Sequence, residues 1–170
     1  MFNRLAYQKE RMSVYENEAG WARITSSALP GAAIAAMRPD YSLLLVQEQR
    51  FLALNAPTTT IWNIPRGASD PGETPEQTAQ REFSEETGIE LATSRFDRVT
   101  GIRPDTGMLL GHVDLFLVDL TWEESEKIRP QPGEIDRIQW MSRAMLQRML
   151  KSGELEDSFT LAALGVIALR

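Results

Sequence analysis

Short runs of apolar residues recur along the chain and predict β-strands. The run at 41–49 (YSLLLVQEQ) is apolar enough to be central in a sheet. Leu29, Pro30 and Gly31 are typical of a turn between two strands. The other predicted strands are 21–26, 31–37, 60–64, 96–102, 113–120 and 135–141.

Helical patterns follow at 74–87, 142–151 and 158–169. The first of these has the clearest boundaries. Thr74 suits the N-cap, Pro75 suits the first helical position, and Gln77 completes a capping box. Gly88 suits the left-handed position that ends a helix. Asp157 is the expected cap of the last helix.

This order of elements is mostly strands, with one helix in mid-chain and two at the end. It predicts an α/β (α+β) fold in which helices pack on a sheet. The chain has 170 residues, a length that suits one domain, so we expect residues 1–170 to share a single core.

The acidic balance of the chain limits what it binds. The net charge is −6, from 24 acidic and 18 basic residues. This charge argues against a protein that binds the phosphate backbone of nucleic acid, which needs a basic surface. It is compatible with a small phosphate-containing substrate, because a bound divalent cation reverses the sign of the local charge.

The residues and segments that the sequence lacks argue against several kinds of site, against a signal peptide and against a membrane span. The chain has no cysteine, which excludes disulfides, thiolate nucleophiles and zinc sites built on cysteine. His112 is the single histidine, and we interpret it as structural. Residues 1–12 lack the apolar segment of a signal peptide. The uncharged segment 24–37 is shorter than the roughly 20 residues that span a bilayer, so we expect a cytoplasmic protein with no membrane partner.

The helix predicted at 74–87 carries a run of carboxylates. Glu82, Glu85 and Glu86 lie at i, i+3 and i+4 and so share one face. Acidic runs are most often solvated surface. Here, like charges at this spacing cost roughly 0.2–0.5 kcal/mol per pair, and they lie in the last turns, where the helix dipole favours cations. We expect no basic side chain one turn away to relieve them, so Mg²⁺ or Mn²⁺ is the favoured partner.

The segment before this helix, 66–73 (RGASDPGE), is rich in turn residues. Its two glycines let backbone groups approach a ligand closely. Glu73 is expected to pair with Arg81 and so to fix the loop against the helix. Alone, such a segment usually indicates no more than a turn.

Loop and helix together match one known pattern at every defined position. The chain resembles the Nudix hydrolase superfamily, whose members cleave nucleoside diphosphates linked to another moiety. The resemblance implies an αβα sandwich with a mixed sheet, dependence on Mg²⁺ or Mn²⁺, and attack of water at one phosphorus of a pyrophosphate. The matching positions are Gly67, five residues, Glu73, seven residues, Arg81, Glu82, Phe83, one residue, Glu85, Glu86, one residue, Gly88 and Ile89.

The resemblance also implies residue roles. Glu82 and Glu86 are the implied metal ligands, helped by Glu85 and by the backbone carbonyl of Arg66. In this family, substrate specificity is determined by the segments that flank the box (residues 67–89) and not by the box itself.

The flanks resemble those of ADP-ribose and nucleoside-diphosphate-sugar pyrophosphatases. Residues 46–51 (VQEQRF) are similar to the RQYR-type segment, in which the arginine helps bind the substrate, often across a dimer. Arg50 is therefore a candidate substrate ligand, and a charged residue that protects a sheet edge is the alternative. Residues 61–67 (IWNIPRG) resemble the WELPRG lead-in, with Asn63 in place of the usual glutamate.

Two further residues in these flanks are candidates for substrate binding. Pro104 lies 15 residues after Ile89, where the ADP-ribose branch carries its marker proline. It also has an alternative interpretation as the end of a strand. The side chain of Arg66, next to the box, is the other candidate.

A carboxylate outside the box is the expected general base, since related pyrophosphatases often supply it from a mobile loop. We expect residues 121–134 to be such a loop, without regular structure. Glu134 is preferred because the Pro-Gly pair before it can aim its side chain. Glu85 inside the box is the alternative, and Arg81 with Glu73 completes the implied catalytic group.

The sequence thus favours a Mg²⁺-dependent pyrophosphatase of ADP-ribose or a related nucleoside diphosphate conjugate, with a homodimer as one implied assembly. Two alternatives stay open. One is another Nudix chemistry, on nucleoside triphosphates or dinucleoside polyphosphates. The other is a non-catalytic domain that binds a nucleotide metabolite, against which the retained box carboxylates weigh.

Overall fold

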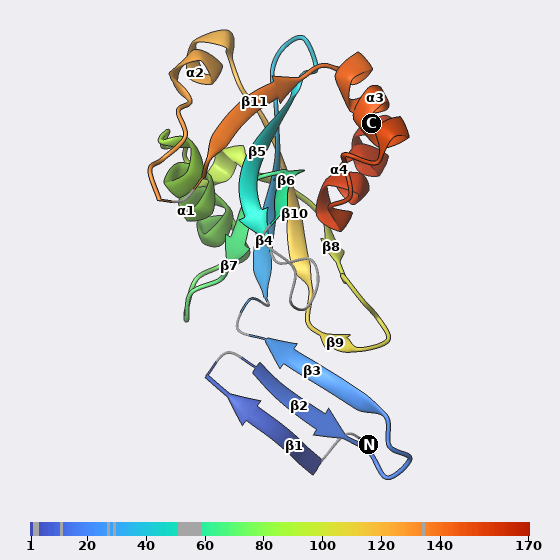
Figure 1. Ribbon diagram of the computed structural model, residues 1–170. Helices are drawn as coiled ribbons and strands as arrows, with labels where there is room; N and C mark the ends of the chain where they lie inside the picture. Colours follow the sequence, from blue (N-terminus) through green and yellow to red (C-terminus); the bar gives the residue numbers. More distant parts are fainter. Residues whose placement is uncertain (2–3, 11, 27, 29, 51–58, 134) are drawn as a thin grey trace.

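The computed structural model describes residues 1, 4–10, 12–26, 28, 30–50, 59–133 and 135–170. In these ranges the chain forms a seven-stranded and a four-stranded sheet with four α-helices (Figure 1). The strands of the larger sheet are β4 (Gly31–Met37), β5 (Leu43–Arg50), β6 (Thr59–Asn63), β7 (Arg66–Ala68), β8 (Asp97–Ile102), β10 (Val113–Asp119) and β11 (Arg137–Met141). Their order is β11-β5-β4-β10-β8, with β6 paired to β5 and β7 paired to β4.

Strand β4 lies at the centre of this sheet. It runs parallel to β10 and antiparallel to β5 and β7, so the sheet is mixed. All seven of its residues are buried, because helices cover both faces of the sheet. Ala33 and Ala35 face one hydrophobic core, and Ala32, Ile34 and Ala36 face the other.

Helices α1 (Pro75–Thr87) and α2 (Trp122–Lys127) lie on one side of the sheet, and α3 (Arg143–Ser152) and α4 (Ser158–Ala168) lie on the other (Figure 1). Phe83 of α1 packs in one core, and Leu146 of α3 and Phe159 of α4 pack in the other. The predicted α/β class, with helices on both faces of a mixed sheet, is confirmed.

The boundaries predicted for α1 are confirmed in detail. The Thr74 hydroxyl accepts a hydrogen bond from the Gln77 N–H, and the Gln77 side chain accepts one from the Thr74 N–H. Gly88 ends the helix at φ 74°, a left-handed conformation that glycine adopts without strain. Asp157 caps α4 as expected, because its carboxylate accepts a hydrogen bond from the Thr160 N–H at 2.8 Å.

The prediction of an irregular loop at 121–134 was wrong for its first half. Residues 122–127 form α2, whose capping box joins Thr121 and Glu124. This Thr-x-x-Glu pattern stabilises a helix start by local hydrogen bonds, and it is present in the sequence. A short helix therefore forms where we expected none.

The smaller sheet has the order β1-β2-β3-β9, and only β3 was predicted. Every residue of β1 is exposed, so no buried face gave that strand an apolar alternation. This sheet projects from the end of the main body (Figure 1). Its strands are β1 (Arg4–Lys9), β2 (Met12–Glu16), β3 (Ala22–Ser26) and β9 (Leu109–Leu110).

No helix in the described ranges has the combined length and apolar character that a membrane crossing requires.

Candidate active site

Helix α1 turns one carboxylate of its acidic run toward the sheet. Ala79 and Phe83 are fully buried, and Glu86 continues their stripe one turn further with only 7% of its surface exposed. The side chain of Glu82 is 14% exposed and that of Glu85 is 49% exposed. The three carboxylates therefore do not form a solvated face, because Glu86 and Glu82 lie largely inside the protein.

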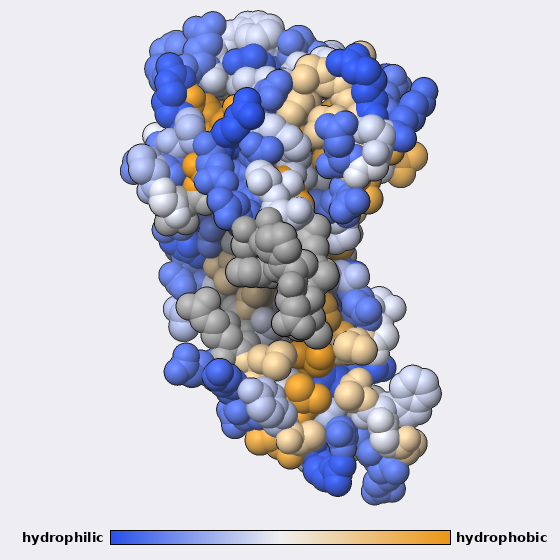
Figure 2. Space-filling model, in the orientation of Figure 1, coloured by the Kyte–Doolittle hydropathy of each residue, from blue (hydrophilic) through white to orange (hydrophobic). Residues whose placement is uncertain are grey.

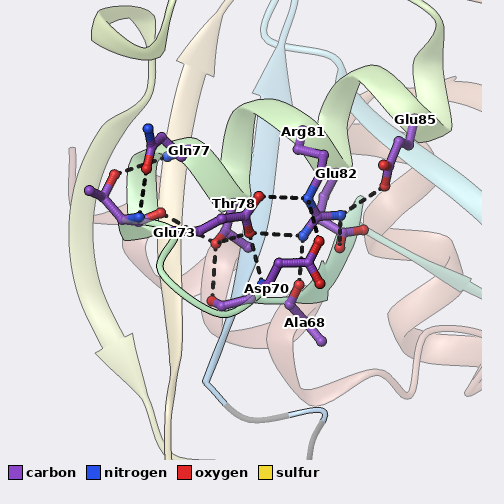
Figure 3. A network of polar contacts seen from close by, with 10 residues as sticks. Ala68, Asp70, Glu73, Gln77, Thr78, Arg81, Glu82 and Glu85 are labelled. Carbon is purple, nitrogen blue, oxygen red and sulfur yellow. Dashed lines mark hydrogen bonds and ion pairs between the residues drawn. The ribbon is translucent and has the colours of Figure 1, made fainter.

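Arg81 binds the carboxylates around it (Figure 3). Its guanidinium donates to Glu73 through Nε at 2.8 Å and Nη2 at 3.1 Å, and to Glu82 and Glu85 through Nη1 at 2.7 and 2.9 Å. Nη2 also donates to the Ala68 carbonyl at 2.7 Å. The predicted Glu73–Arg81 pair is therefore present. Our expectation that no basic residue relieves the acidic run was wrong, because Arg81 lies one turn before Glu85.

Glu73 ties the loop before α1 to this network. Its carboxylate also accepts hydrogen bonds from the Asp70 N–H and the Thr78 hydroxyl, both at 2.9 Å. The hydrogen bonds from Arg81, more than any other contact, lower the pKa of Glu73 to about 2. A carboxylate this strongly held remains charged across the physiological range and fixes the loop against the helix.

Gly67 lets the loop pass close to α1. A Cβ atom at this position would overlap the carboxylate of Glu82, so any side chain here would displace that group. The backbone of β7 thus lies directly against the acidic end of the helix.

Arg66 directs its backbone toward the same place. The Ile34 N–H donates to the Pro65 carbonyl at 2.8 Å, so Pro65 faces β4 in the ladder. The next residue along a strand turns its N–H and C=O the opposite way. Accordingly the Arg66 N–H reaches Glu86 Oε1 at 3.4 Å. Because the N–H and C=O of one strand residue lie on the same edge of the strand, we infer that the Arg66 carbonyl is directed to this side as well.

Glu86 is the most perturbed acid of the site. Burial is the main cause that raises its pKa, to about 9, and repulsion from Glu48 and Glu82 adds to the effect. Its Oε2 is buried and, in the described ranges, has no hydrogen-bond partner. Burial also raises the pKa of Glu82, while Arg81 opposes that shift. Such buried, unpartnered carboxylate oxygen is the donor type that Mg²⁺ or Mn²⁺ binds.

The described side chains do not form a complete cation cage. No group of three or more Asp, Glu or His residues in these ranges is arranged to hold a metal. Mg²⁺ commonly binds through one or two carboxylates and completes its shell with water and substrate phosphates. Glu86 and Glu82, with the Arg66 carbonyl, fit that pattern.

A cavity of about 440 Å³ opens beside Arg66 and Gly67. Arg50 from β5 and Pro104 from the segment after β8 also line it. The structure therefore brings the three predicted substrate-binding residues together next to the start of the box. The remaining lining residues are Ser26, Ala28, Ala32, Ala68, Leu109, Val113 and Phe159.

Arg66 is held in this cavity by Asp157, the N-cap of α4, and by Phe159 in its first turn, and the sequence did not predict that either residue lies in the site. Its Nη2 lies 3.4 Å from the carboxylate of Asp157, and its guanidinium lies 5.0 Å from the ring centre of Phe159. The Nε atoms of Arg66 and Arg50 are both buried without a hydrogen-bond partner in the described ranges. Two arginines with unused donors suit an anionic ligand.

One other residue near the acidic cluster was also missed. Glu48 on β5 accepts hydrogen bonds from Arg50 at 2.6 Å and from Asn63 at 2.8 Å. The sequence offered one local signal, since Glu48 and Arg50 are two apart and so share a strand face.

Glu134, the preferred general base, lies outside the described residues.

Comparison with known proteins decides the family. A family model, the NUDIX domain, matches residues 28–162. The chain belongs to the Nudix family. The cluster on α1 and the loop before it are therefore its Nudix box, and the family resemblance of the sequence is confirmed.

The curated relatives match this Nudix chain over short segments. Nudix hydrolase 2 of Arabidopsis thaliana is 35% identical over 81 residues, which are 48% of this chain and 28% of that protein. The protein named "Putative 8-oxo-dGTP diphosphatase 3" of Mycobacterium tuberculosis (strain ATCC 25618 / H37Rv) is 41% identical over 69 residues, 41% of this chain and 30% of the relative. "Putative 8-oxo-dGTP diphosphatase" of Bacillus subtilis (strain 168) is 37% identical over 54 residues, 32% of this chain and 36% of the relative. The matches thus span about a third of each relative.

Proposed function

We propose that this Nudix protein is a divalent-metal-dependent pyrophosphohydrolase of ADP-ribose or a related nucleoside diphosphate sugar. The products are a nucleoside monophosphate and a sugar phosphate. One observation carries the proposal. The cavity that begins at Arg66 and Gly67 also contains Arg50 and Pro104, which come from the segments that resemble the ADP-ribose branch. Its volume of about 440 Å³ is in the range of small-molecule sites.

The two arginines suit the central pyrophosphate of such a substrate. A guanidinium binds phosphate oxygens through two parallel N–H donors, and it keeps its charge at any physiological pH. Asp157 and Phe159 position Arg66, while Glu48 positions Arg50. The geometry therefore favours a ligand with adjacent phosphates at the mouth of the box.

The proposed cation ligands are Glu82, Glu86 and the Arg66 carbonyl. Glu85, which directly precedes Glu86 in the chain, is proposed to help them. Bound Mg²⁺ or Mn²⁺ would polarise the phosphate oxygens and lower the pKa of the attacking water. Arg81 holds Glu82 and Glu85 in place through its hydrogen bonds. The proton from water is proposed to pass to a carboxylate, with Glu134 preferred and Glu85 as the alternative.

A nucleoside triphosphate is the second candidate substrate, because two relatives carry the name 8-oxo-dGTP diphosphatase. The proposal predicts that, with Mg²⁺, ADP-ribose yields AMP and ribose 5-phosphate at a higher kcat/KM than 8-oxo-dGTP is hydrolysed. Initial rates over a panel of both substrate classes, with products resolved by chromatography, measure this. A clear preference for the triphosphate would refute the ADP-ribose assignment and retain the pyrophosphohydrolase.

Arg50→Ala extends the same test to a residue of the cavity. It should raise KM for ADP-ribose more than it lowers kcat, since it removes binding that ground state and transition state share. Arg137→Ala, on the neighbouring strand β11, is the matched control for loss of a positive charge. Equal KM values for Arg50→Ala and the control would exclude Arg50 from substrate binding.

We further propose that a second copy of the chain covers the smaller sheet. Among the strands that the structure describes, β1 pairs only with β2, which leaves its other edge available to a strand of a second copy. Figure 2 shows hydrophobic surface at the end of the molecule where this sheet lies. Large apolar side chains lie exposed on the sheet and the loops beside it. They are Leu5, Tyr7, Met12, Trp21, Met108 and Leu110.

Light scattering after size-exclusion chromatography should therefore give twice the chain mass of 19.1 kDa. The double variant Leu5→Glu/Tyr7→Glu should shift the protein to the monomer, because it places charges on the open strand. A wild-type chain that is monomeric at every concentration tested would contradict the homodimer.

A further inference from the structure

Glu48, a carboxylate outside the Nudix box, lies close enough to Glu86 for their charges to repel each other. We propose that Glu48 belongs to the cation site by accepting hydrogen bonds from the water molecules bound to the cation, and that Asn63 and Arg50 hold it there. The inference rests on the proposed function for the cation itself. It adds a positioning residue that connects the cation to the substrate-binding arginine.

The strand register places Glu48 on the same side of the sheet as α1. Leu44 of β5 packs in the core that contains Phe83 of α1. Side chains two residues apart along a strand share a face, so Glu48 and Arg50 point to that side as well. Asn63 lies directly opposite Val46 in the β5–β6 pairing and reaches Glu48 with its side-chain amide.

The contacts of Glu48 fix its carboxylate at this position. Its Oε1 accepts from Asn63 Nδ2 at 2.8 Å and from Arg50 Nη2 at 2.6 Å, and its side chain is only 16% exposed. Asn63 is fully buried, so it holds Glu48 from inside the protein. The negative charge of Glu48 is near enough to Glu86 for the two to repel each other.

Two buried oxygens beside Glu48 have no partner in the described ranges. They are Oε2 of Glu86 and Oδ1 of Asn63, which is 0% exposed. A buried acceptor without a donor is costly unless a cation or water satisfies it. Glu48, Asn63 and Glu86 come from two strands and one helix, β5, β6 and α1, and a hydrated divalent cation would supply the positive charge and the water donors that their unpartnered oxygens lack.

The residue type at position 63 follows from this arrangement. An amide donates to the Glu48 carboxylate, whereas a second carboxylate at position 63 would oppose it with like charge. The chain therefore has its carboxylate on β5 and its amide on β6. Asparagine therefore suits position 63 of this chain, where the WELPRG segment that it resembles has glutamate.

Mn²⁺ binding to the full chain, followed by electron paramagnetic resonance without any substrate, tests the inference. Glu48→Gln should weaken Mn²⁺ affinity about 10–100-fold, the usual cost of losing a group that supports a metal site through hydrogen bonds. Glu18→Gln, an exposed carboxylate in the β2–β3 turn, should leave the affinity unchanged. Should Glu48→Gln not fold, Glu48→Asp retracts the carboxylate and keeps its charge, and it should weaken binding to a smaller degree.

The exchange variant Glu48→Gln/Asn63→Glu provides an independent readout. It restores one carboxylate and one amide in exchanged positions, so it should regain most of the affinity that Glu48→Gln loses. Asn63→Glu alone should lower the melting temperature of the metal-free protein because two carboxylates then face each other. A double variant that binds no better than Glu48→Gln would overturn the role assigned to Asn63.

Wild-type Mn²⁺ affinity in Glu48→Gln would overturn the role of Glu48 itself. If Glu86→Gln loses the metal in the same experiment, the proposed function stands and only this inference fails. If the wild-type chain binds no Mn²⁺, the metal-dependent function fails instead. The three outcomes differ in which protein fails to bind Mn²⁺, and all of them are measured without turnover.

Discussion

Glu86→Gln is expected to lower kcat by several orders of magnitude and leave the protein folded. Glutamine keeps the shape of the side chain but removes the charge of the most buried box carboxylate. A cation at the site then loses a ligand whose Oε2 has no other partner in the described ranges. Steady-state kinetics with Mg²⁺, alongside circular dichroism, measures both quantities. Near-normal turnover by a folded variant would remove Glu86 from the metal site.

The pH dependence of the metal-free protein follows from the same residue. Burial raises the pKa of Glu86 in the folded chain from its ordinary 4.5 to about 9. The folded state therefore holds a proton that the unfolded state releases. The stability from this proton is complete below pH 4.5 and is lost as pH rises toward 9. Thermal melting without metal should show this decline in the wild type, and Glu86→Gln should lack this contribution.

Metal binding should show the opposite trend, because the cation displaces that proton. Mg²⁺ affinity of the wild type should increase with pH until Glu86 has lost its proton, at about 9. Isothermal titration calorimetry in buffers of different ionisation enthalpy also counts the proton released. Affinity that does not change between pH 6 and 9 would contradict the raised pKa.

Arg81→Met should destabilise the protein more than loss of an ordinary surface arginine. The Arg81 side chain is 26% exposed, and its guanidinium forms ion pairs with Glu73, Glu82 and Glu85, which the variant leaves without their shared cation. Breaking a buried ion pair costs about 3–5 kcal/mol, and partial exposure reduces this to about 2–4 kcal/mol. Urea unfolding measures the change.

Two companion variants make the Arg81 result interpretable. Arg95→Met removes a partly exposed arginine that forms an ion pair with Glu124, and it should cost about 1 kcal/mol or less. Arg81→Lys keeps the charge but loses the planar set of donors, so stability should return only in part. An equal loss of unfolding free energy in Arg81→Met and Arg95→Met would show that the Arg81 network stabilises the fold no more than one surface ion pair does.

The Arg81 network also has a pH signature. Arg81 lowers the pKa of Glu73 from 4.5 to about 2, so the stabilisation is present above pH 4.5 and is lost as pH falls through 2. Arg81→Met should therefore lose less stability on acidification than the wild type does. Melting temperatures over the acid range give the comparison.

The boundaries of α1 and the position of the Nudix box could be predicted from the sequence because the signals for them are local. Thr74, Gln77 and Gly88 act on their immediate neighbours, so their pattern alone predicts where the helix begins and ends. The capping box at Thr121 and Glu124 was equally local, and α2 could have been predicted from it.

Contacts between distant strands could not be read in the same way. Glu48 meets Asn63 only because β5 and β6 pair in one register, and no local pattern specifies that pairing. Asp157 reaches Arg66 across the packing of α4 on the sheet. The resemblance to the ADP-ribose branch did name Arg50 and Pro104, which the fold then brought into one cavity.

Hydrolysis of ADP-ribose in ¹⁸O-labelled water tests the central claim most directly, namely that the box carboxylates and the arginine-lined cavity form one pyrophosphatase site. Mass spectrometry of the products, with Mg²⁺ and with excess chelator, is the measurement. The account predicts AMP and ribose 5-phosphate, with one labelled oxygen on one of the two phosphates, and no products under chelation. Intact ADP-ribose in the presence of Mg²⁺, bound but not cleaved, would contradict it and identify a nucleotide-binding domain instead.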